Sequence, residues 1–170
     1  LLVGLLMLGG MDWFDSICHA FATTGTGGFS TKQASVAYYN SPYIEYVISI
    51  FMFISGINFT LLLLFVNRKF KKFIGNAELK FYFGSVVLFT AVIAIVLYYT
   101  SPMGMEESFR KSLFQVISLQ TSTGFATDDY MQWTPVLWGL LTIIMLMGAC
   151  AGSTTGGLKC IRMVILTKVS

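Results

Sequence analysis

Charged residues are scarce in this chain of 170 residues: 11% are Asp, Glu, Lys or Arg, whereas 55% are hydrophobic. Soluble globular domains carry about 25% charged residues. Together with a mean hydropathy of +0.73, this composition predicts a membrane protein surrounded by lipid. The net charge is only +3, without a dense basic stripe, so no nucleic acid is expected as a partner.

Cysteine and histidine are also scarce. Cys18, Cys150 and Cys160 lack the close spacing of a metal site, and their odd number argues against a closed disulfide framework. We interpret them as small packing residues. His19 has no neighbour spaced as a metal ligand or catalytic group, so it is expected to have a packed or hydrogen-bonded structural role. No nucleophile, base and oxyanion donors converge on one segment, so we predict neither an enzyme nor a cofactor.

Two polar segments look like copies of one loop. Residues 24–31 read Thr-Gly-Thr-Gly-Gly-Phe-Ser-Thr, and residues 120–127 read Gln-Thr-Ser-Thr-Gly-Phe-Ala-Thr. Aligning their Gly-Phe pairs also superposes Thr31 on Thr127. Non-helical backbone at membrane depth is tolerated only where it is buried in protein or lines a water-filled path. The two loops therefore indicate a pore.

The segments around the loops repeat as well, in the order span, short half-helix, polar loop, span. This order predicts an all-α membrane protein with a re-entrant pore half-helix in each unit. Because Leu1 lies inside an apolar run, we expect an internal piece of a longer polypeptide, with the first helix truncated. The expected units are 1–72, with helices at 1–10, 11–22 and 43–66, and 73–170, with helices at 79–100, 106–119 and 136–147.

The charges predict an orientation. The cationic cluster at 68–72 should face the cytoplasm, which places both loops on the outer side of the membrane. Acids on that side either attract cations to the pore mouth or cap half-helices and solvate loops. Capping is favoured for Asp12, Asp15, Glu106 and Glu107. The acids on the outer side are mainly Asp12, Asp15, Glu45, Glu106, Glu107, Asp128 and Asp129.

Both loops offer hard oxygen ligands. A half-helix that enters from outside directs its negative C-terminal end toward the membrane interior, which favours a cation. Glycines allow carbonyl oxygens to turn inward, and Thr and Ser add hydroxyls, so an alkali cation is the expected ligand rather than a transition metal. The candidate cation-binding residues are Gly25, Thr26, Gly27, Gly28, Thr121, Ser122, Thr123 and Gly124.

The segment 148–157 allows two interpretations. Gly148, Gly152 and Gly156 are spaced by four, a pattern typical of closely packed membrane helices. However, the polar residues 153–155 and the adjacent glycines 156 and 157 are poor helix formers and offer hydroxyls to a polar path. Lys159 is expected to reach the inner interface by snorkelling rather than to contact this segment.

Four segments together resemble the Trk/Ktr/HKT superfamily of potassium transporters: 22–31, 55–59, 121–127 and 148–159. They cover nearly the whole chain. The resemblance implies a subunit of four membrane-pore-membrane units, of which this chain corresponds to the second and third in a bacterial Trk type. It also implies that Gly28 and Gly124 are filter glycines, preceded by cation-lining carbonyls.

The resemblance further implies potassium uptake across the plasma (inner) membrane, a homodimer, and a cytoplasmic nucleotide-binding regulatory subunit. It makes 148–157 an intramembrane gate below the filter. A non-conducting structural subunit, whose glycines serve only helix packing, remains the alternative. The candidate gate residues are Gly148, Gly152, Ser153, Thr154, Thr155, Gly156 and Gly157.

Overall fold

The structure is a computed structural model that describes residues 1–169, and the regular structure of these residues is helical. The predicted all-α class is confirmed. The α-helices are α1 (Leu2–Leu8), α2 (Trp13–Thr24), α3 (Pro42–Ser55), α4 (Phe59–Val66), α5 (Phe70–Ile74), α6 (Ala77–Thr100), α7 (Met105–Gln120), α8 (Pro135–Leu146) and α9 (Cys160–Val169), and the short 3₁₀ helices are η1 (Ser35–Tyr39) and η2 (Tyr130–Gln132).

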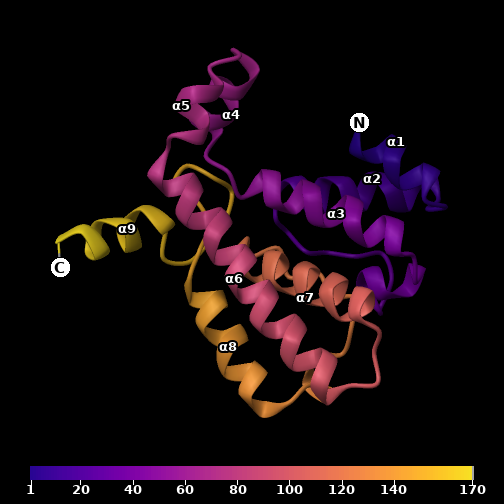
Figure 1. Cartoon of the computed structure of the whole chain (residues 1–170). Helices are drawn as coiled ribbons and strands as arrows, with labels where there is room; N and C mark the ends of the chain where they lie inside the picture. The colour runs from indigo at the N-terminus through magenta and orange to yellow at the C-terminus, as the bar shows by residue number, and fades with distance from the viewer. Residues whose placement is uncertain (170) are drawn as a thin grey trace.

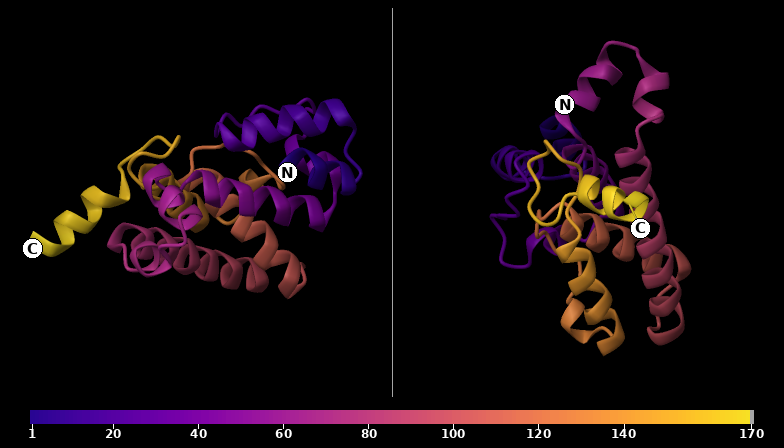
Figure 2. Two further views of the ribbon diagram at one scale, coloured as in Figure 1. Left: turned by 90° about the horizontal axis from the view of Figure 1, so that it is seen from above. Right: turned by 90° about the vertical axis from the view of Figure 1, so that its left-hand side faces the viewer.

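The helices form two groups that meet at α7. Figure 1 shows α1, α2 and α3 on one side and α6 and α8 on the other, and α7 packs against α3, α6 and α8. The α4–α5 hairpin and α9 project away from these groups (Figures 1 and 2). The segments that follow α2, α7 and α8 therefore converge near the centre of the molecule.

Helix α6 is long and apolar enough to cross a membrane, with 24 residues. Its start is fixed by Asn76, whose side-chain oxygen accepts hydrogen bonds from the backbone N–H groups of Glu78 at 2.9 Å and Leu79 at 3.2 Å. The helix predicted at 79–100 lies within α6.

The apolar run 43–66, expected as one continuous span, is broken into α3 and α4, which meet at 103°. Asn58 caps α4 by accepting a hydrogen bond from the N–H of Thr60 at 2.8 Å. A Cβ at Gly56 would lie 2.9 Å from the ring of Tyr82 and 3.0 Å from the methyl group of Thr121. The cap and this close approach both lie at the break. The run is nevertheless apolar along its length, so its hydropathy alone predicts one continuous span.

Helix α7 buries polar side chains that tie the two groups of helices together. The Arg110 guanidinium forms ion pairs with Glu45 on α3 and with Glu106 one turn away, the latter at 3.0 Å. At the other end, the Gln120 amide donates to the hydroxyl of Ser85 on α6 at 2.7 Å. These bonds fix both ends of α7 and satisfy polar groups that would otherwise be costly to bury.

Replacing Arg110 with Leu is expected to lower the free energy of unfolding by about 3 kcal/mol, because Glu45 is left buried without its partner. The double variant Arg110→Leu with Glu45→Leu should recover most of this loss. The check is thermal unfolding of the detergent-purified protein, with Lys69→Leu on the exposed surface as the control. A double variant as unstable as the single one would contradict the assignment.

Candidate functional site

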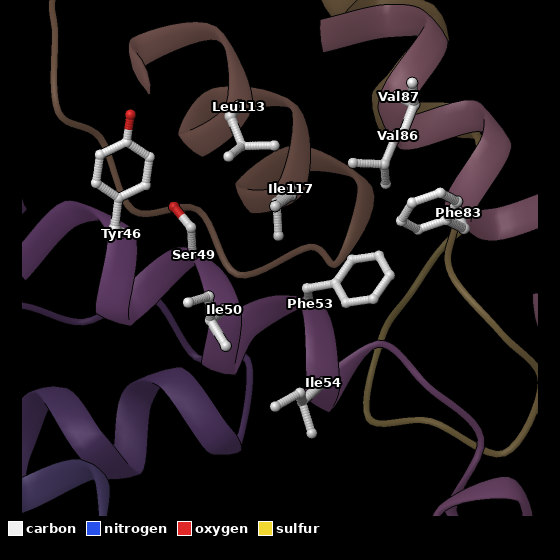
Figure 3. Close-up of a pocket in the computed structure, with 10 residues that line it drawn as sticks. All are labelled: Tyr46, Ser49, Ile50, Phe53, Ile54, Phe83, Val86, Val87, Leu113 and Ile117. Carbon is white, nitrogen blue, oxygen red and sulfur yellow. The ribbon is translucent and has the colours of Figure 1, made fainter. Parts of the chain in front are cut away.

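The pocket where α3, α6 and α7 meet does not offer ligands for a cation. Figure 3 shows its lining, which is mostly aliphatic and aromatic and includes Phe53, Phe83 and Ile117. Its volume is about 220 Å³, and hydroxyl groups reach its wall only from Tyr46 and Ser49. Candidate oxygen ligands therefore have to be sought in the non-helical segments.

The two loops share one backbone conformation. The residue that ends each preceding helix has nearly the same angles: φ −84° and ψ 0° at Gly25, and φ −85° and ψ −1° at Thr121. A left-handed residue follows, and a second one comes two positions later. The left-handed residues are Thr26 (φ 51°) and Gly28 (φ 67°) in the first loop, and Ser122 (φ 56°) and Gly124 (φ 83°) in the second.

The hydrogen bonds of the two loops match as well. The N–H of Gly27 donates to the carbonyl of Ala22 at 2.8 Å, and at the same position of the repeat the N–H of Thr123 donates to Ser118, also at 2.8 Å. Each loop is thus folded back onto the last turn of its own helix. The internal repeat inferred from the sequence extends to backbone geometry.

The two loops lie directly against each other. A Cβ built on Gly28 would overlap the carbonyl oxygen of Thr123 and lie 2.9 Å from its carbonyl carbon. Only glycine leaves room for this approach, and the positive φ at this position also favours glycine. A Cβ on Gly124 would meet no atom within 4 Å in the described part of the chain.

The segment between α8 and α9 lies against both loops. The Thr26 hydroxyl donates to the carbonyl of Thr154 at 3.2 Å. A Cβ at Gly156 would lie 3.3 Å from the hydroxyl oxygen of Ser122, which occupies the position of Thr26 in the second loop. This segment is not helical, so the spacing of its glycines by four does not create a helix-packing face.

The base of this segment is held by backbone contacts. Its two ends pair side by side, with the N–H of Gly148 bonded to the carbonyl of Leu158 at 2.9 Å. The Glu78 carboxylate on α6 accepts the N–H of Ala151 at 2.5 Å, and the Gly56 carbonyl accepts the N–H of Cys150 at 3.1 Å. The segment therefore depends on the start of α6 and on the break between α3 and α4.

Lys159 does not lie as expected. Its ammonium group donates to the backbone carbonyl of Thr155 and, at 3.1 Å, to the hydroxyl of the same residue. The prediction that Lys159 snorkels away from the segment is wrong, because the carbonyl exposed by the missing helix turn attracts the cation more effectively than a distant interface. Lys159, which follows the segment, thus holds Thr155 within it.

The acids predicted to lie on the outer side mostly form ion pairs. Those favoured as caps stand at helix N-termini, Asp12 as the N-cap residue of α2 and Asp15, Glu106 and Glu107 in first turns, but within the described residues α2 and α7 have no side-chain cap hydrogen bond. Asp15 pairs with Lys32 at 3.1 Å and accepts hydroxyl hydrogen bonds from Thr31 and Tyr39, both at 2.7 Å. The hydroxyl of Tyr39, followed by that of Thr31 and the ammonium of Lys32, lowers the pKa of Asp15 to about 2. Asp15 is therefore ionised at physiological pH. Cations also pair with Glu45, Glu106, Glu107 and Asp128.

His19 has the structural role predicted for it. The side chain is fully buried. Its Nδ1 donates to the carbonyl of Asp15 at 2.8 Å, its Nε2 lies 2.9 Å from the hydroxyl of Ser30, and its ring stacks on Phe125 with centroids 5.7 Å apart. His19 thus connects α2 to the segments that leave both loops. The predicted packing role of cysteine agrees with buried, unpaired Cys150 and Cys160.

Two residues to which the sequence assigned no role support the site, although Asn58 lies in the segment 55–59 that carries the family resemblance. Glu78 is 4% exposed and anchors the segment after α8, and Asn58 lies beside Gly152, whose Cβ would be 3.3 Å from its amide oxygen. A lone acid at the start of an apolar helix is a usable signal, because such residues are expensive to bury without a partner.

Replacing Lys159 with Met is expected to loosen residues 148–157, because Thr155 loses both hydrogen bonds from the ammonium group. Hydrogen–deuterium exchange should increase about tenfold at the tip of the segment, as for a loss of ~1.4 kcal/mol in local stability. Arg162→Met, a change of an exposed cation on α9, serves as the control. Equal exchange in both variants would contradict the role of Lys159.

Known proteins resemble this chain along most of its length. The family model TrkH, described as a cation transport protein, matches residues 7–170. The Trk system potassium uptake protein TrkH of Escherichia coli (strain K12) is 39% identical over 96% of this chain, and that of Halomonas elongata is 35% identical over 95%. The chain spans about a third of the length of these relatives, 34% in each case.

A solved structure agrees with the fold. The crystal structure of the potassium transporter TrkH from Vibrio parahaemolyticus superposes with a TM-score of 0.91 at 36% sequence identity, covering 97% of this chain and 36% of that chain. Sequence and fold therefore agree over nearly every described residue, and this chain belongs to the TrkH family of cation transport proteins.

Proposed function

We propose that this chain forms part of a potassium-uptake pathway across the inner membrane, in which backbone carbonyl oxygens of the loops 24–31 and 120–127 coordinate the ion. The observation that carries the proposal is the contact of Gly28 with the carbonyl of Thr123, because it brings two polar loops of equal conformation together. The names of the relatives, which are potassium uptake proteins, support the choice of ion.

The helices add an electrostatic argument. Both α2 and α7 end where a loop begins, at Thr24 and Gln120. The carbonyl ends of two helices then face the same region, and each contributes a partial negative charge. A cation is stabilised there and an anion is repelled. Three cations, Lys32, Arg110 and Lys111, pair with the acids at 15, 45, 106, 107 and 128 and offset part of their charge. We assign the proposed selectivity to the loops rather than to these acids.

Two exposed edges support completion of the pathway by the rest of a longer subunit. Among the described residues, a Cβ on Gly124 would meet no atom within 4 Å, whereas the same position in the first loop, Gly28, meets the second loop. Phe29 is 82% exposed, whereas Phe125 at the same position of the repeat is fully buried. We propose that further loops cover these edges and complete a ring of oxygens, with all loops facing outside. A homodimer and a cytoplasmic nucleotide-binding regulatory subunit belong to the same proposal.

The segment 148–157 is proposed as the gate. Its contacts with Thr26 and Ser122 lie within the loops that carry the candidate oxygens. With the loops facing outside, as proposed, the segment lies on their inner side. A cation that leaves the loops on this side has to pass the segment. Movement of the segment away from Thr26 and Ser122 would open the path.

A structural subunit without conduction is less well supported. That alternative needs the glycines to serve helix packing, yet Gly28, Gly124 and Gly152 have positive φ and lie outside helices. Gly28 also approaches a carbonyl group rather than a helix surface.

The filter assignment predicts a strong effect of Gly28→Ala in the full-length protein. Rubidium uptake by intact cells should fall by about tenfold or more, because the added methyl displaces the Thr123 carbonyl and strains a left-handed backbone. The Rb⁺/Na⁺ uptake ratio should fall as well. Gly84→Ala is the matched control, since a Cβ there meets no atom within 4 Å. Normal uptake and normal discrimination in Gly28→Ala would refute the assignment.

The gate assignment predicts the opposite effect for a shortened segment. Removing residues 153–155 should raise rubidium flux by about tenfold, the consequence of a ~1.4 kcal/mol shift toward the open path. The measurement is flux per molecule, with the amount of protein in the membrane as the control. Unchanged flux and unchanged regulation would rule out a gate at this position.

A further inference from the structure

Two ion pairs, one beside each loop, connect the incoming helix to the outgoing segment. In the first repeat, the Lys32 ammonium lies 3.1 Å from Asp15 on α2. In the second, the ammonium of Lys111 on α7 lies 3.4 Å from Asp128. Each pair therefore closes the loop between its two ends.

The pairs occupy the same positions of the repeat with reversed charges. When the two loops are aligned, Asp15 falls on Lys111 and Lys32 falls on Asp128. In both pairs the helix side chain is the more buried one, with exposed fractions of 8% for Asp15 and 15% for Lys111 against 31% for Lys32 and 24% for Asp128. An ion pair is thus present in both repeats, but the acid and the base have exchanged positions.

In both repeats, an aromatic hydrogen-bond donor lies beside the acid of the ion pair. The Tyr39 hydroxyl donates to the carboxylate of Asp15 at 2.7 Å, and the Trp133 indole N–H donates to that of Asp128 at 3.2 Å. In each repeat, an aromatic side chain from the segment after the loop thus supports the carboxylate. The acid has a second partner whether it stands on the helix or after the loop.

The hydroxyl groups of Thr31 and Thr127 differ in a way that follows the exchange of charges. Thr31 donates to the Asp15 carboxylate at 2.7 Å. Thr127 stands at the same position of the second repeat and is 7% exposed, yet its hydroxyl has no hydrogen-bond partner within the described residues. Lys111 replaces the acid there, and an ammonium group cannot accept the hydroxyl proton of Thr127 as the Asp15 carboxylate accepts that of Thr31. The charge reversal accounts for the missing acceptor, and among the described residues no donor reaches the Thr127 oxygen either.

We propose that each ion pair is a clamp that positions its loop, and that the clamp requires opposite charges but no particular polarity. This inference rests on the proposed function, because it assigns the clamps to the loops that bind the cation. The four charged groups are positioning residues and do not touch the ion. The first clamp is a single pair of opposite charges. In the second, Lys111 also lies 3.0 Å from Glu107 one turn earlier on α7, so it connects an acid of its own helix to Asp128 after the loop.

Charge swaps test the clamp in the full-length protein. Asp128→Lys alone places two ammonium groups together, and rubidium uptake and the Rb⁺/Na⁺ ratio are each expected to fall about tenfold. Adding Lys111→Asp restores opposite charges across the clamp, and Glu107→Gln in the same variant removes the acid that would otherwise face the new carboxylate. Together these changes should return both values to within about twofold of Glu107→Gln alone. Asp15→Lys, alone and with Lys32→Asp, tests the first clamp in the same way.

Exposed neighbours of the clamps provide controls. Gln33→Lys and Met131→Lys add a positive charge to the same surface without breaking a clamp. Both are expected to keep uptake and the ratio within about twofold, as for surface substitutions away from a structural feature.

The Thr127 hydroxyl predicts a difference in stability between the two charge-swapped variants. The swap in the second repeat supplies Thr127 with an acceptor at position 111, whereas the swap in the first repeat removes the acceptor of Thr31 at position 15. The second-repeat swap should therefore unfold at the higher temperature. Equal or reversed midpoints would overturn the explanation of the unpaired Thr127 hydroxyl.

Neutral variants keep the test decisive if a charge reversal prevents folding. Asp128→Asn removes the attraction without adding repulsion and should lower the Rb⁺/Na⁺ ratio severalfold. Single variants with normal uptake and ratio, or a swap as defective as its single variant, would overturn the clamp. Failure of the proposed function would instead show as normal uptake and ratio in Gly28→Ala, so the two failures are distinguishable.

Discussion

The approach of Gly28 to the carbonyl of Thr123 is the constraint on which the rest of the structure depends. It requires two polar, non-helical segments to meet inside a largely apolar molecule, where unpaired backbone groups are costly. Each loop meets this requirement by folding back on its own helix with the same hydrogen bonds and the same pair of left-handed residues. The buried polar side chains of α7 then hold that helix at the required position between α3 and α6.

A second layer of contacts relates the loops to the segment after α8. Thr26 and Ser122, at matching positions, are both within reach of this segment. The segment in turn hangs from Glu78 at the start of α6 and from Gly56 at the break between α3 and α4. A displacement of the start of α6 or of the break between α3 and α4 would thus be transmitted to the proposed gate through two hydrogen bonds, one accepted by the Glu78 carboxylate and one by the Gly56 carbonyl. This arrangement requires the break in the apolar run 43–66, because in a straight helix the Gly56 carbonyl would not accept the hydrogen bond from the segment.

Sequence patterns predicted the parts that are determined locally. The loops, the short helices before them and the helix at 79–100 follow from glycine content, segment length and hydropathy, and they appear near the expected bounds. The bend at Gly56 could not be predicted, because it depends on Tyr82 and Thr121 approaching from other elements. The partner of Lys159 and the pairing of Lys111 with Asp128 were missed for the same reason. Charge counting assigns a side of the membrane, whereas an ion pair depends on which residues meet in space.

The central claim is that backbone oxygens of the two loops coordinate the transported ion. Anomalous X-ray scattering from rubidium, in crystals of the full-length protein grown with Rb⁺ in place of K⁺, tests this claim most directly. We expect a peak enclosed by the segments 25–28 and 121–124, at the ends of α2 and α7. The absence of a peak there, or rubidium bound only to acidic side chains outside the two loops, would contradict the account.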